Sequence, residues 1–173
     1  EQFLVWYLRI LEVPRVRVPR GDRYLRRARD LLRGFRFVRQ EPFECTLSYV
    51  LSVQAHMSLT KRRIQFLGKI LGKEILFEGE RYWTFPTPVA LARLNGAYFR
   101  AQRFGWRSER LAVSAGTLAG ELEERGIQDP VDGGLDLWRE LVDELKAEGG
   151  TGVGLKVGKC IDLFALERMG AVP

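Results

Sequence analysis

The sequence predicts a mostly α-helical fold for the 173-residue chain. Most windows place their apolar residues at the i, i+3, i+4 spacing of a helix. Glycine, proline or a capping residue bounds most of these windows. Strand-like alternation is confined to "RVRV" (15–18) and to the stretch near 35–38. The composition, 46% hydrophobic and 29% charged, is typical of a chain that folds around a core.

Three helices are expected in the N-terminal half. The first, "GDRYLRRARDLL" (21–32), has its leucines at helical spacing. The second, "PFECTLSYVLSVQA" (42–55), begins with Pro42 in its first turn and is apolar nearly all round, which predicts a central buried helix. The third, 58–72, is expected to begin at Ser58 as a capping residue.

The C-terminal half is predicted to be helical after a loop that is rich in aromatic residues (77–85). A helix should open behind the prolines of "PTPVALARL". A helix of small residues (108–126) and a strongly amphipathic one (135–150) both end at glycine. A glycine-rich turn then leads to a last helix, from about residue 155 to 166.

The net charge of +6 is unevenly distributed. Residues 1–40 hold eleven arginines against four acidic residues, whereas residues 121–148 hold ten acidic against three basic residues. A locally positive chain suits a polyanion, of which DNA and RNA are the commonest. A solvated basic face without a partner is the alternative.

Other classes are excluded by simple counts. No apolar run approaches the roughly 18–20 residues that span a membrane, so no membrane partner is expected. Two cysteines and one histidine provide neither a disulfide framework nor a zinc or iron–sulfur pattern. We expect an intracellular protein of the cytoplasm or nucleoid in a prokaryote. Asn95 is the only asparagine, and this scarcity points to a thermophilic source.

The stretch "GGTGVGLKVGKC" (149–160) combines five glycines with two lysines, a pattern that approaches phosphate. It is not the phosphate loop of an NTPase, because Gly158-Lys159 is followed by Cys160 instead of Ser or Thr. It is not a dinucleotide fingerprint either, because a helix and not a strand precedes it. A helix–turn–helix whose turn binds a DNA phosphate remains, with an ordinary connection between helices as the alternative.

The segment "GVGLKVGKCIDLFAL" (152–166) resembles the helix-hairpin-helix of the 8-oxoguanine DNA glycosylase/lyase family. That family belongs to the helix-hairpin-helix (HhH-GPD) superfamily of DNA glycosylases. Three further segments are similar to the same family in the same order: "FRFVRQEPFECTLSYVLS" (35–52), "YWTFPTPVALARL" (82–94) and "FGWRSERL" (104–111). The ordered matches cover residues 3 to 173.

The resemblance implies that Lys156 is the nucleophile of a bifunctional glycosylase/lyase that acts on 8-oxoguanine in duplex DNA. An amine can attack C1′ of the deoxyribose, displace the base and form a Schiff base. The amine must be neutral to attack, so burial among other positive charges is expected for it. The alternative for a lysine at a helix start is a phosphate contact. The reaction implied needs no metal and no organic cofactor.

The resemblance implies further roles for residues on both sides of the lysine. The damaged base leaves the stack, and something must fill the space that it vacates. The residues concerned are Gly152, Val153 and Gly154 as a clamp for a DNA phosphate, Cys160 in the base pocket, Trp106 as the wedge, Arg107 on the unpaired base, and Gln54 and His56 in the minor groove. Simpler roles are a core thiol for Cys160, a core ring with a surface arginine for Trp106 and Arg107, and a helix-end residue for His56.

The same resemblance divides the chain into three parts. Residues 1–40 would be a helical segment of a second, incomplete lobe, and residues 41–166 a six-helix-type lobe with its hairpin at 150–155. Residues 167–173 would connect to further C-terminal helices, and the catalytic aspartate of the family would fall beyond Pro173. We therefore expect a longer natural protein that acts as a monomer. Gly150-Thr151 replaces the usual Leu-Pro, which predicts a looser entry to the hairpin.

Three alternatives to this function stay open. The hairpin could serve a non-catalytic DNA-binding module, which would bind DNA without cleaving it. The enzyme could instead be a glycosylase for alkylated or mismatched bases. A nucleotide-hydrolysing enzyme is a third possibility, which the spacing of the glycines disfavours.

Overall fold

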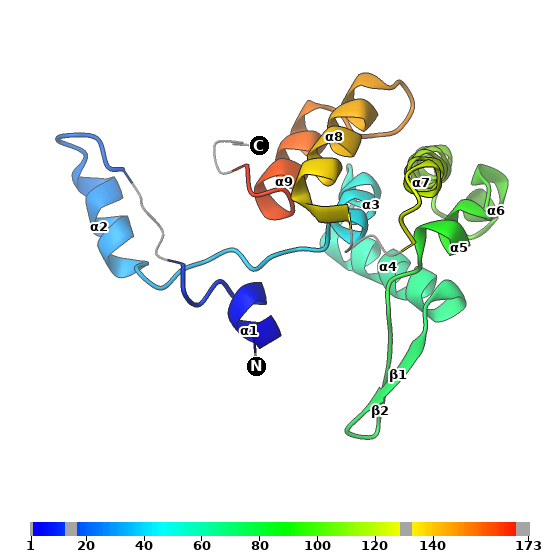
Figure 1. Cartoon of the computed structure of the whole chain (residues 1–173), viewed down its shortest axis with the longest axis horizontal. Helices are drawn as coiled ribbons and strands as arrows, with labels where there is room; N and C mark the ends of the chain where they lie inside the picture. The colour runs from blue at the N-terminus through cyan, green and yellow to red at the C-terminus, as the bar shows by residue number, and fades with distance from the viewer. Residues whose placement is uncertain (1, 13–16, 129–132, 169–173) are drawn as a thin grey trace. The chain divides into compact units, whose positions relative to one another are not determined.

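The computed structural model describes residues 2–12, 17–128 and 133–168. The chain divides into two compact units, residues 1–40 and 41–173. Helices are the main regular structure of the described residues (Figure 1), so the prediction of a mostly α-helical fold is confirmed.

The first unit contains two helices, α1 (Gln2–Tyr7) and α2 (Arg23–Leu31). Helix α2 lies within the predicted range, and Asp22 caps it by accepting a hydrogen bond from the backbone N–H of Leu25 (2.9 Å). No side chain of α2 is buried. The apolar residues whose spacing predicted this helix are therefore not covered by other residues of the first unit.

A carboxylate and three arginines hold the rest of the first unit together. Glu12 forms ion pairs with Arg9 and with Arg39. Arg36 donates from Nε to the carbonyl oxygens of Arg9 and Glu12 at 2.9 and 3.0 Å. The guanidinium of Arg39 also lies over the ring of Trp6 (5.1 Å). These contacts join residues near 6–12 to residues near 36–39.

The second unit is a helical assembly with one small sheet (Figure 1). Its helices lie close to the predicted ranges, apart from the short α6. The elements are α3 (Pro42–Ser52), α4 (Met57–Leu71), β1 (Glu74–Phe77), β2 (Glu80–Trp83), α5 (Pro88–Ala92), α6 (Gly96–Ala101), α7 (Arg107–Glu124), α8 (Gly134–Ala147) and α9 (Leu155–Phe164).

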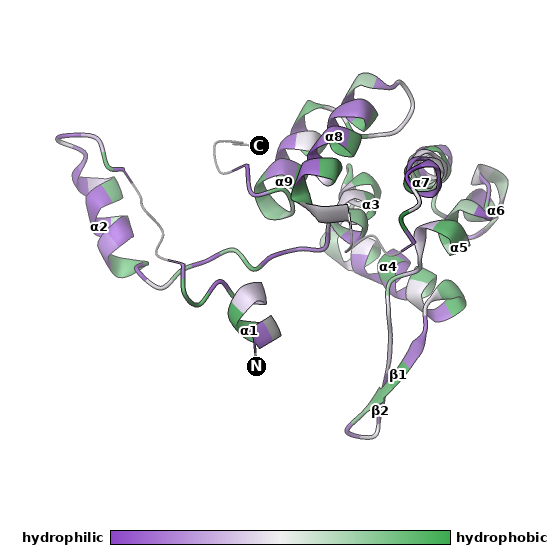
Figure 2. Cartoon of the chain, viewed as in Figure 1, coloured by the Kyte–Doolittle hydropathy of each residue, from purple (hydrophilic) through white to green (hydrophobic). Residues whose placement is uncertain are grey.

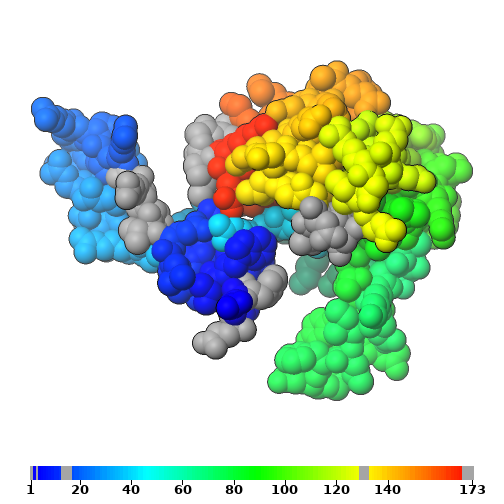
Figure 3. Space-filling model, viewed as in Figure 1, coloured from blue at the N-terminus to red at the C-terminus, as the bar shows by residue number. Residues whose placement is uncertain are grey.

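Strands β1 and β2 form an antiparallel hairpin where the sequence analysis expected a loop. Glu78 and Gly79 join them with φ values of 50° and 80°. Positive φ at both central residues is the conformation that matches the twist of a two-residue hairpin. The hairpin projects from its unit in the space-filling view (Figure 3), and most of its side chains are exposed.

The expected strand-like stretches do not form strands. Residues 35–38 and 17–18 have no regular structure, and residues 15–16 lie outside the described part. The expected cap of α4 was also wrong. The N-cap is His56 and not Ser58, since the helix begins at Met57 and the side chain of His56 accepts from the N–H of Ser58.

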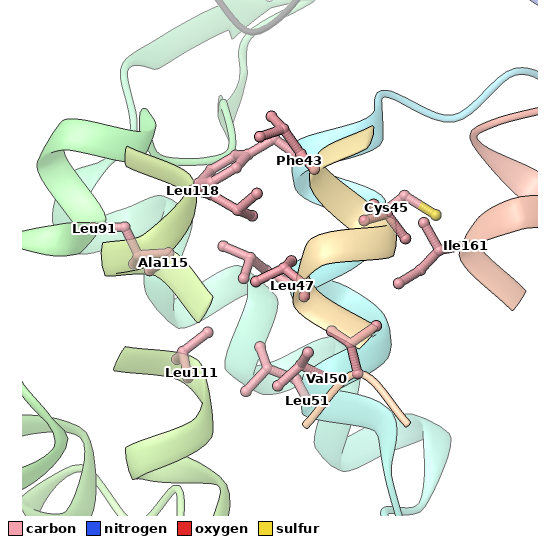
Figure 4. Close-up of a cluster of buried hydrophobic side chains, with 14 of the residues drawn as sticks. Phe43, Cys45, Leu47, Val50, Leu51, Leu91, Leu111, Ala115, Leu118 and Ile161 are labelled. Carbon is pink, nitrogen blue, oxygen red and sulfur yellow. The ribbon is translucent and has the colours of Figure 1, made fainter. Parts of the chain in front are cut away.

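Helix α3 is the centre of the core, as its apolar sequence predicted. Its N-terminus is capped by Glu41, whose carboxylate accepts from the N–H groups of Phe43 and Glu44. Figure 4 shows side chains of α3 between those of α7 and Ile161 of α9. Those labelled on α3 and α7 are Phe43, Cys45, Leu47, Val50, Leu51, Leu111, Ala115 and Leu118, all of them buried.

Helix α8 has two chemically different faces. Hydrophilic and hydrophobic residues alternate along it (Figure 2). The buried residues are all apolar: Trp138, Leu141, Val142 and Leu145. This apolar side packs toward α7 and α9, so α8 supports the segment that follows it.

Among the described helices, none has the combination of length and apolar character that a bilayer-spanning helix requires.

Candidate active site

The turn between α8 and α9 has a conformation that only glycine adopts readily. Gly150 and Gly152 have φ values of 88° and 80°, in the left-handed region. Space is also limited at Gly152. A Cβ there would lie 3.0 Å from Cδ of Arg110 and 3.3 Å from Cγ1 of Val50. The glycines therefore allow a tight turn that lies against α3 and α7.

Thr151 fixes this turn from inside. Its side chain is buried, and its hydroxyl donates to the carbonyl oxygen of Leu145 (2.8 Å) and accepts from the N–H of Val153 (3.2 Å). The hydroxyl of Ser114 on α7 donates to the carbonyl oxygen of Thr151 (2.5 Å). A buried threonine therefore ties the turn to α7 and α8, and the expectation of an entry looser than in relatives stays a prediction.

The start of α9 presents unpaired backbone donors to solvent. Gly154 is the N-cap, is exposed and makes no side-chain cap hydrogen bond. The first N–H groups of a helix have no partner within the helix and attract anions. An added Cβ at Gly154 would meet nothing within 4 Å, so the surface here is open to a ligand.

The turn forms one wall of a hollow of about 480 Å³. Residues of three other elements form the rest of the lining. Most of the charged side chains that line the hollow are basic. The hollow is lined by Val53, Arg110, Lys146, Glu148 and residues 150–157, which include Lys156.

Lys156 is the second residue of α9 and lies in the wall of this hollow. Its side chain is exposed, so the burial that the sequence analysis expected is not provided by the described residues. Within the described ranges, Lys156 makes neither a hydrogen bond nor an ion pair. Its amine is therefore available to contact a ligand that binds at the turn.

Cys160 lies one helical turn after Lys156 and is partly buried. Burial raises the pKa of its thiol, and the positive charge of Lys156 opposes this shift. Burial likewise raises the pKa of the Cys45 thiol and of the Tyr49 phenol, each to about 12, and Cys160 contributes to both shifts. Three weakly ionised groups therefore lie together beside the lysine.

An aromatic pair extends this group. The rings of Tyr49 and Phe164 are stacked, with centroids 6.0 Å apart and planes at 20°. Tyr49 belongs to α3 and Phe164 to the end of α9, and these two helices are in contact. Flat apolar surface and weakly acidic groups are therefore available on the side of α9 that carries Cys160.

A charged network that the sequence analysis missed holds α9 against α8. Lys146 on α8 forms ion pairs with Asp143 (2.9 Å) and with Asp162 on α9 (2.8 Å). Arg168 pairs with the same two carboxylates at 2.7 and 2.9 Å. Lys146 passes over Gly158, where an added Cβ would lie 2.5 Å from Cε of the lysine. A glycine in the first turns of α9 is therefore required for this bridge.

Arg107 is placed differently from what the resemblance implied for it. The side chain is 5% exposed, and its Nε donates to the carbonyl oxygen of Val53 at 2.7 Å. Burial, and secondarily the charge of Arg110, lowers the pKa of its guanidinium. In the free chain, Arg107 therefore anchors the loop between α3 and α4 and is not presented at the surface.

The structure brings the other expected duplex contacts close to that loop. Trp106 is 44% exposed, and the guanidinium carbons of Arg107 and Arg110 lie 4.4 and 4.5 Å from its ring centroid. Gln54 and His56 are exposed within the loop that Arg107 anchors. Gln54 has a φ of 49°, a strained value for a residue with a side chain.

The site thus combines an exposed amine, a glycine turn that leads into the open N-terminus of α9, and an exposed aromatic ring. Its sequence signal was the Gly-x-Gly-x-Lys pattern and the Gly-Trp-Arg segment. Arg110 and Lys146 also belong to the site and were missed, because only the fold places them beside the turn. No cluster of three or more His, Cys, Asp or Glu side chains that could hold a metal ion occurs among the residues described.

Comparison with known proteins identifies relatives in sequence and in fold. No family model matches the chain. A probable N-glycosylase/DNA lyase of Methanothermobacter thermautotrophicus is 30% identical, and the match covers 88% of this chain and 53% of that protein. An N-glycosylase/DNA lyase of Arabidopsis thaliana is 27% identical, with 82% of this chain and 38% of that protein covered. The chain thus spans about half the length, or less, of the curated relatives it matches.

Solved structures share the fold. An 8-oxoguanine glycosylase/lyase of Clostridium acetobutylicum, in its apo form, matches with a TM-score of 0.68 and 26% identity, over 88% of this chain and 51% of that one. A complex of a Clostridium acetobutylicum 8-oxoguanine glycosylase/lyase with double-stranded DNA matches with a TM-score of 0.70 and 22% identity, over 98% of this chain and 57% of that one. The chain is thus similar in sequence to N-glycosylase/DNA lyases, and it shares the fold of solved 8-oxoguanine glycosylase/lyases.

Proposed function

We propose that the protein is a base-excision-repair enzyme that removes 8-oxoguanine from duplex DNA and then nicks the strand. The observation that carries the proposal is the position of Lys156. Its exposed amine stands in the first turn of α9, directly after a turn whose backbone is suited to bind phosphate. This arrangement occurs in a chain whose relatives are named N-glycosylase/DNA lyases.

In this reaction Lys156 acts as the nucleophile. The neutral Nζ attacks C1′ of the deoxyribose, and the bond between C1′ and the base breaks as the base leaves with the electron pair and takes up a proton. Loss of a proton from Nζ and opening of the sugar give an iminium between Nζ and C1′. The iminium makes the 2′ proton acidic, so β-elimination expels the 3′ phosphate and leaves the strand nicked.

The backbone of the turn binds the DNA beside the damaged base. Gly152, Val153 and Gly154 form the phosphate clamp, with the exposed Gly154 at the N-terminus of α9. Trp106 fills the space in the duplex, since its ring is large, partly exposed and adjacent to two guanidinium groups. Gln54 and His56 contact the minor groove from the loop that Arg107 holds.

Arg107 takes part in recognition of the unpaired partner base after its side chain leaves the carbonyl oxygen of Val53. Because the side chain is buried and bonded to Val53 in the free chain, this role requires a change of conformation on DNA binding. The extruded base is received beside Cys160, where Tyr49 and Phe164 supply flat apolar surface.

The proposal includes the setting in which the enzyme works. The substrate is damaged double-stranded DNA in the cytoplasm or nucleoid, and the protein acts as a monomer. The chemistry described above is carried by an amine, so it uses neither a metal ion nor an organic cofactor.

Borohydride reduction tests the proposal, because it converts the iminium into a stable bond between Lys156 and the sugar. The protein is incubated with a duplex that contains 8-oxoguanine, and the covalent complex is measured after denaturing electrophoresis. We expect Lys156→Gln to abolish trapping. Lys159→Gln, which removes a lysine three residues away on the same helix, should trap as the parent does.

Each of the other outcomes of this experiment would indicate a different nucleophile or a different activity. Trapping that survives Lys156→Gln would exclude this residue as the nucleophile. Salt-sensitive DNA binding without trapping or nicking would indicate a non-catalytic binding module. Trapping with alkylated or mismatched bases, but not with 8-oxoguanine, would assign a different glycosylase specificity.

A further inference from the structure

Arg110 occupies a central position between two parts of the site. It lies on α7, one helical turn after Trp106, and its guanidinium stacks on the ring of that residue (4.5 Å). Its aliphatic stem covers Gly152, so closely that a Cβ on the glycine would lie 3.0 Å from Cδ and 3.2 Å from Cβ of the arginine. Arg110 also lines the hollow that contains Lys156.

The charge of Arg110 is not neutralised by a carboxylate among the described residues. Arg107 is a neighbour of the same sign, and burial first and then the charge of Arg110 lower the pKa of its guanidinium. Glu148 is a carboxylate in the wall of the same hollow, and Thr117 donates a hydrogen bond to it (3.4 Å). Two guanidinium groups packed on one ring, without an acidic partner, leave a local excess of positive charge at the edge of the turn.

The contact with Trp106 also limits where the group can move. The guanidinium carbon lies over the ring, 4.5 Å from its centroid, and the N–H donors of a guanidinium can form a forked pair of bonds to a phosphate. Little conformational entropy is lost on binding, because the stem is already held between the ring and the turn.

We propose that Arg110 binds a phosphate of the DNA backbone together with the N–H groups at the start of α9. The inference rests on the proposed function, since it assigns to the same DNA a contact with a further side chain. Arg110 adds a charged side chain to a clamp otherwise made of backbone. It also joins the clamp to the wedge, because one side chain contacts both Trp106 and Gly152.

The salt dependence of DNA binding tests the inference. The affinity of the intact protein for a duplex with a stable abasic-site analogue is measured over a series of salt concentrations. Arg110→Met retains the apolar stem and removes the charge. We expect the slope of log K against log salt to become shallower by about 0.9, the value for one phosphate contact, which is about eightfold over a tenfold range of salt.

Two controls separate binding from folding. Arg110→Lys should restore the slope, because it restores a charge without the planar group. Arg81→Gln, which removes an exposed arginine on β2, should leave the slope unchanged. Unfolding midpoints show whether each variant is folded.

The failures of the two proposals are distinguishable. If the parent binds DNA and the folded Arg110→Met variant keeps the parental slope, only the inference about Arg110 is overturned. If the parent binds no DNA at any salt concentration, the proposed function is overturned and the inference with it.

Discussion

Nε of Arg107 lies 2.7 Å from the carbonyl oxygen of Val53, a residue 54 positions earlier in the chain. Nη2 of the same guanidinium donates to the same oxygen. Arg107 is the first residue of α7, and Val53 is the C-cap of α3. One buried side chain thus connects the wedge segment to the loop that carries Gln54 and His56.

We expect Arg107→Ala to lower the free energy of unfolding by about 1.5–3 kcal/mol, because a charged hydrogen bond to a carbonyl is lost. Urea denaturation measures the change. Arg107→Lys should recover only part of it, since an ammonium does not reproduce a planar fork. Arg93→Ala, at an exposed position on the end of α5, should change stability by less than about 0.5 kcal/mol. Equal effects at both positions would show that the Val53 contact contributes little.

The hydroxyl of Thr151 should be needed for the stability of the turn. Thr151→Val keeps the shape of the side chain but leaves the carbonyl oxygen of Leu145 and the N–H of Val153 without this partner. We expect a loss of about 1–3 kcal/mol in the free energy of unfolding. Thr117→Val is the matched control, because its hydroxyl makes only a long contact (3.4 Å) to an exposed glutamate. A stable Thr151→Val variant would show that the glycines alone determine the turn.

Helix periodicity and capping residues predicted most of the helices, because both signals are local in the sequence. The central burial of α3 followed from a helix that is apolar nearly all round. Helix α6 was missed although Asn95 caps it by accepting from the N–H of Tyr98 (2.9 Å). An asparagine before "GAYF" is a cap signal that could have predicted this helix.

The β1–β2 hairpin was missed for a different reason. Its side chains are mostly exposed, so no alternation between buried and exposed residues marks the strands. The only local signal was Glu78-Gly79 between two short stretches rich in apolar residues.

The site was predictable where its residues are adjacent in sequence and not where the fold unites them. The roles expected for residues between Gly152 and Cys160 came from the resemblance of one contiguous segment and stay predictions. The bridge from Lys146 to Asp162 spans 16 residues, and Arg110 lies about 40 residues before the turn that it covers. Tertiary packing determines such pairs, and a single sequence does not show them.

Stability should fall in acid because of Asp143. Its hydrogen bond with Arg168, and secondarily its contact with Lys146, holds the pKa of its carboxyl well below the usual value. The unfolded chain therefore binds a proton before the folded chain does, and protonation favours unfolding. The contribution of Asp143 is fully present above about pH 4 and is lost progressively at lower pH. Urea denaturation at a series of pH values should show a shallower decline for Asp143→Asn, and identical declines would exclude the network as the cause.

Alanine at Gly152 and at Gly154 should separate folding from DNA binding. Gly152 has a positive φ, and a Cβ there would press on Arg110 and Val50, so Gly152→Ala should destabilise by about 1 kcal/mol or more. Gly154 has an ordinary φ of −78° with no atom within 4 Å of an added Cβ, so Gly154→Ala introduces no strain and should cost only the loss of a better N-cap residue, about 0.5–1 kcal/mol.

The new methyl group of Gly154→Ala would nevertheless stand where a phosphate approaches the start of α9. We therefore expect weaker binding of duplex DNA by a protein that urea denaturation shows to be folded, measured by titration at fixed salt. Normal DNA binding by Gly154→Ala would contradict the assignment of this residue to the phosphate clamp. Weaker binding by Gly152→Ala alone would not support the clamp, because partial unfolding also weakens binding.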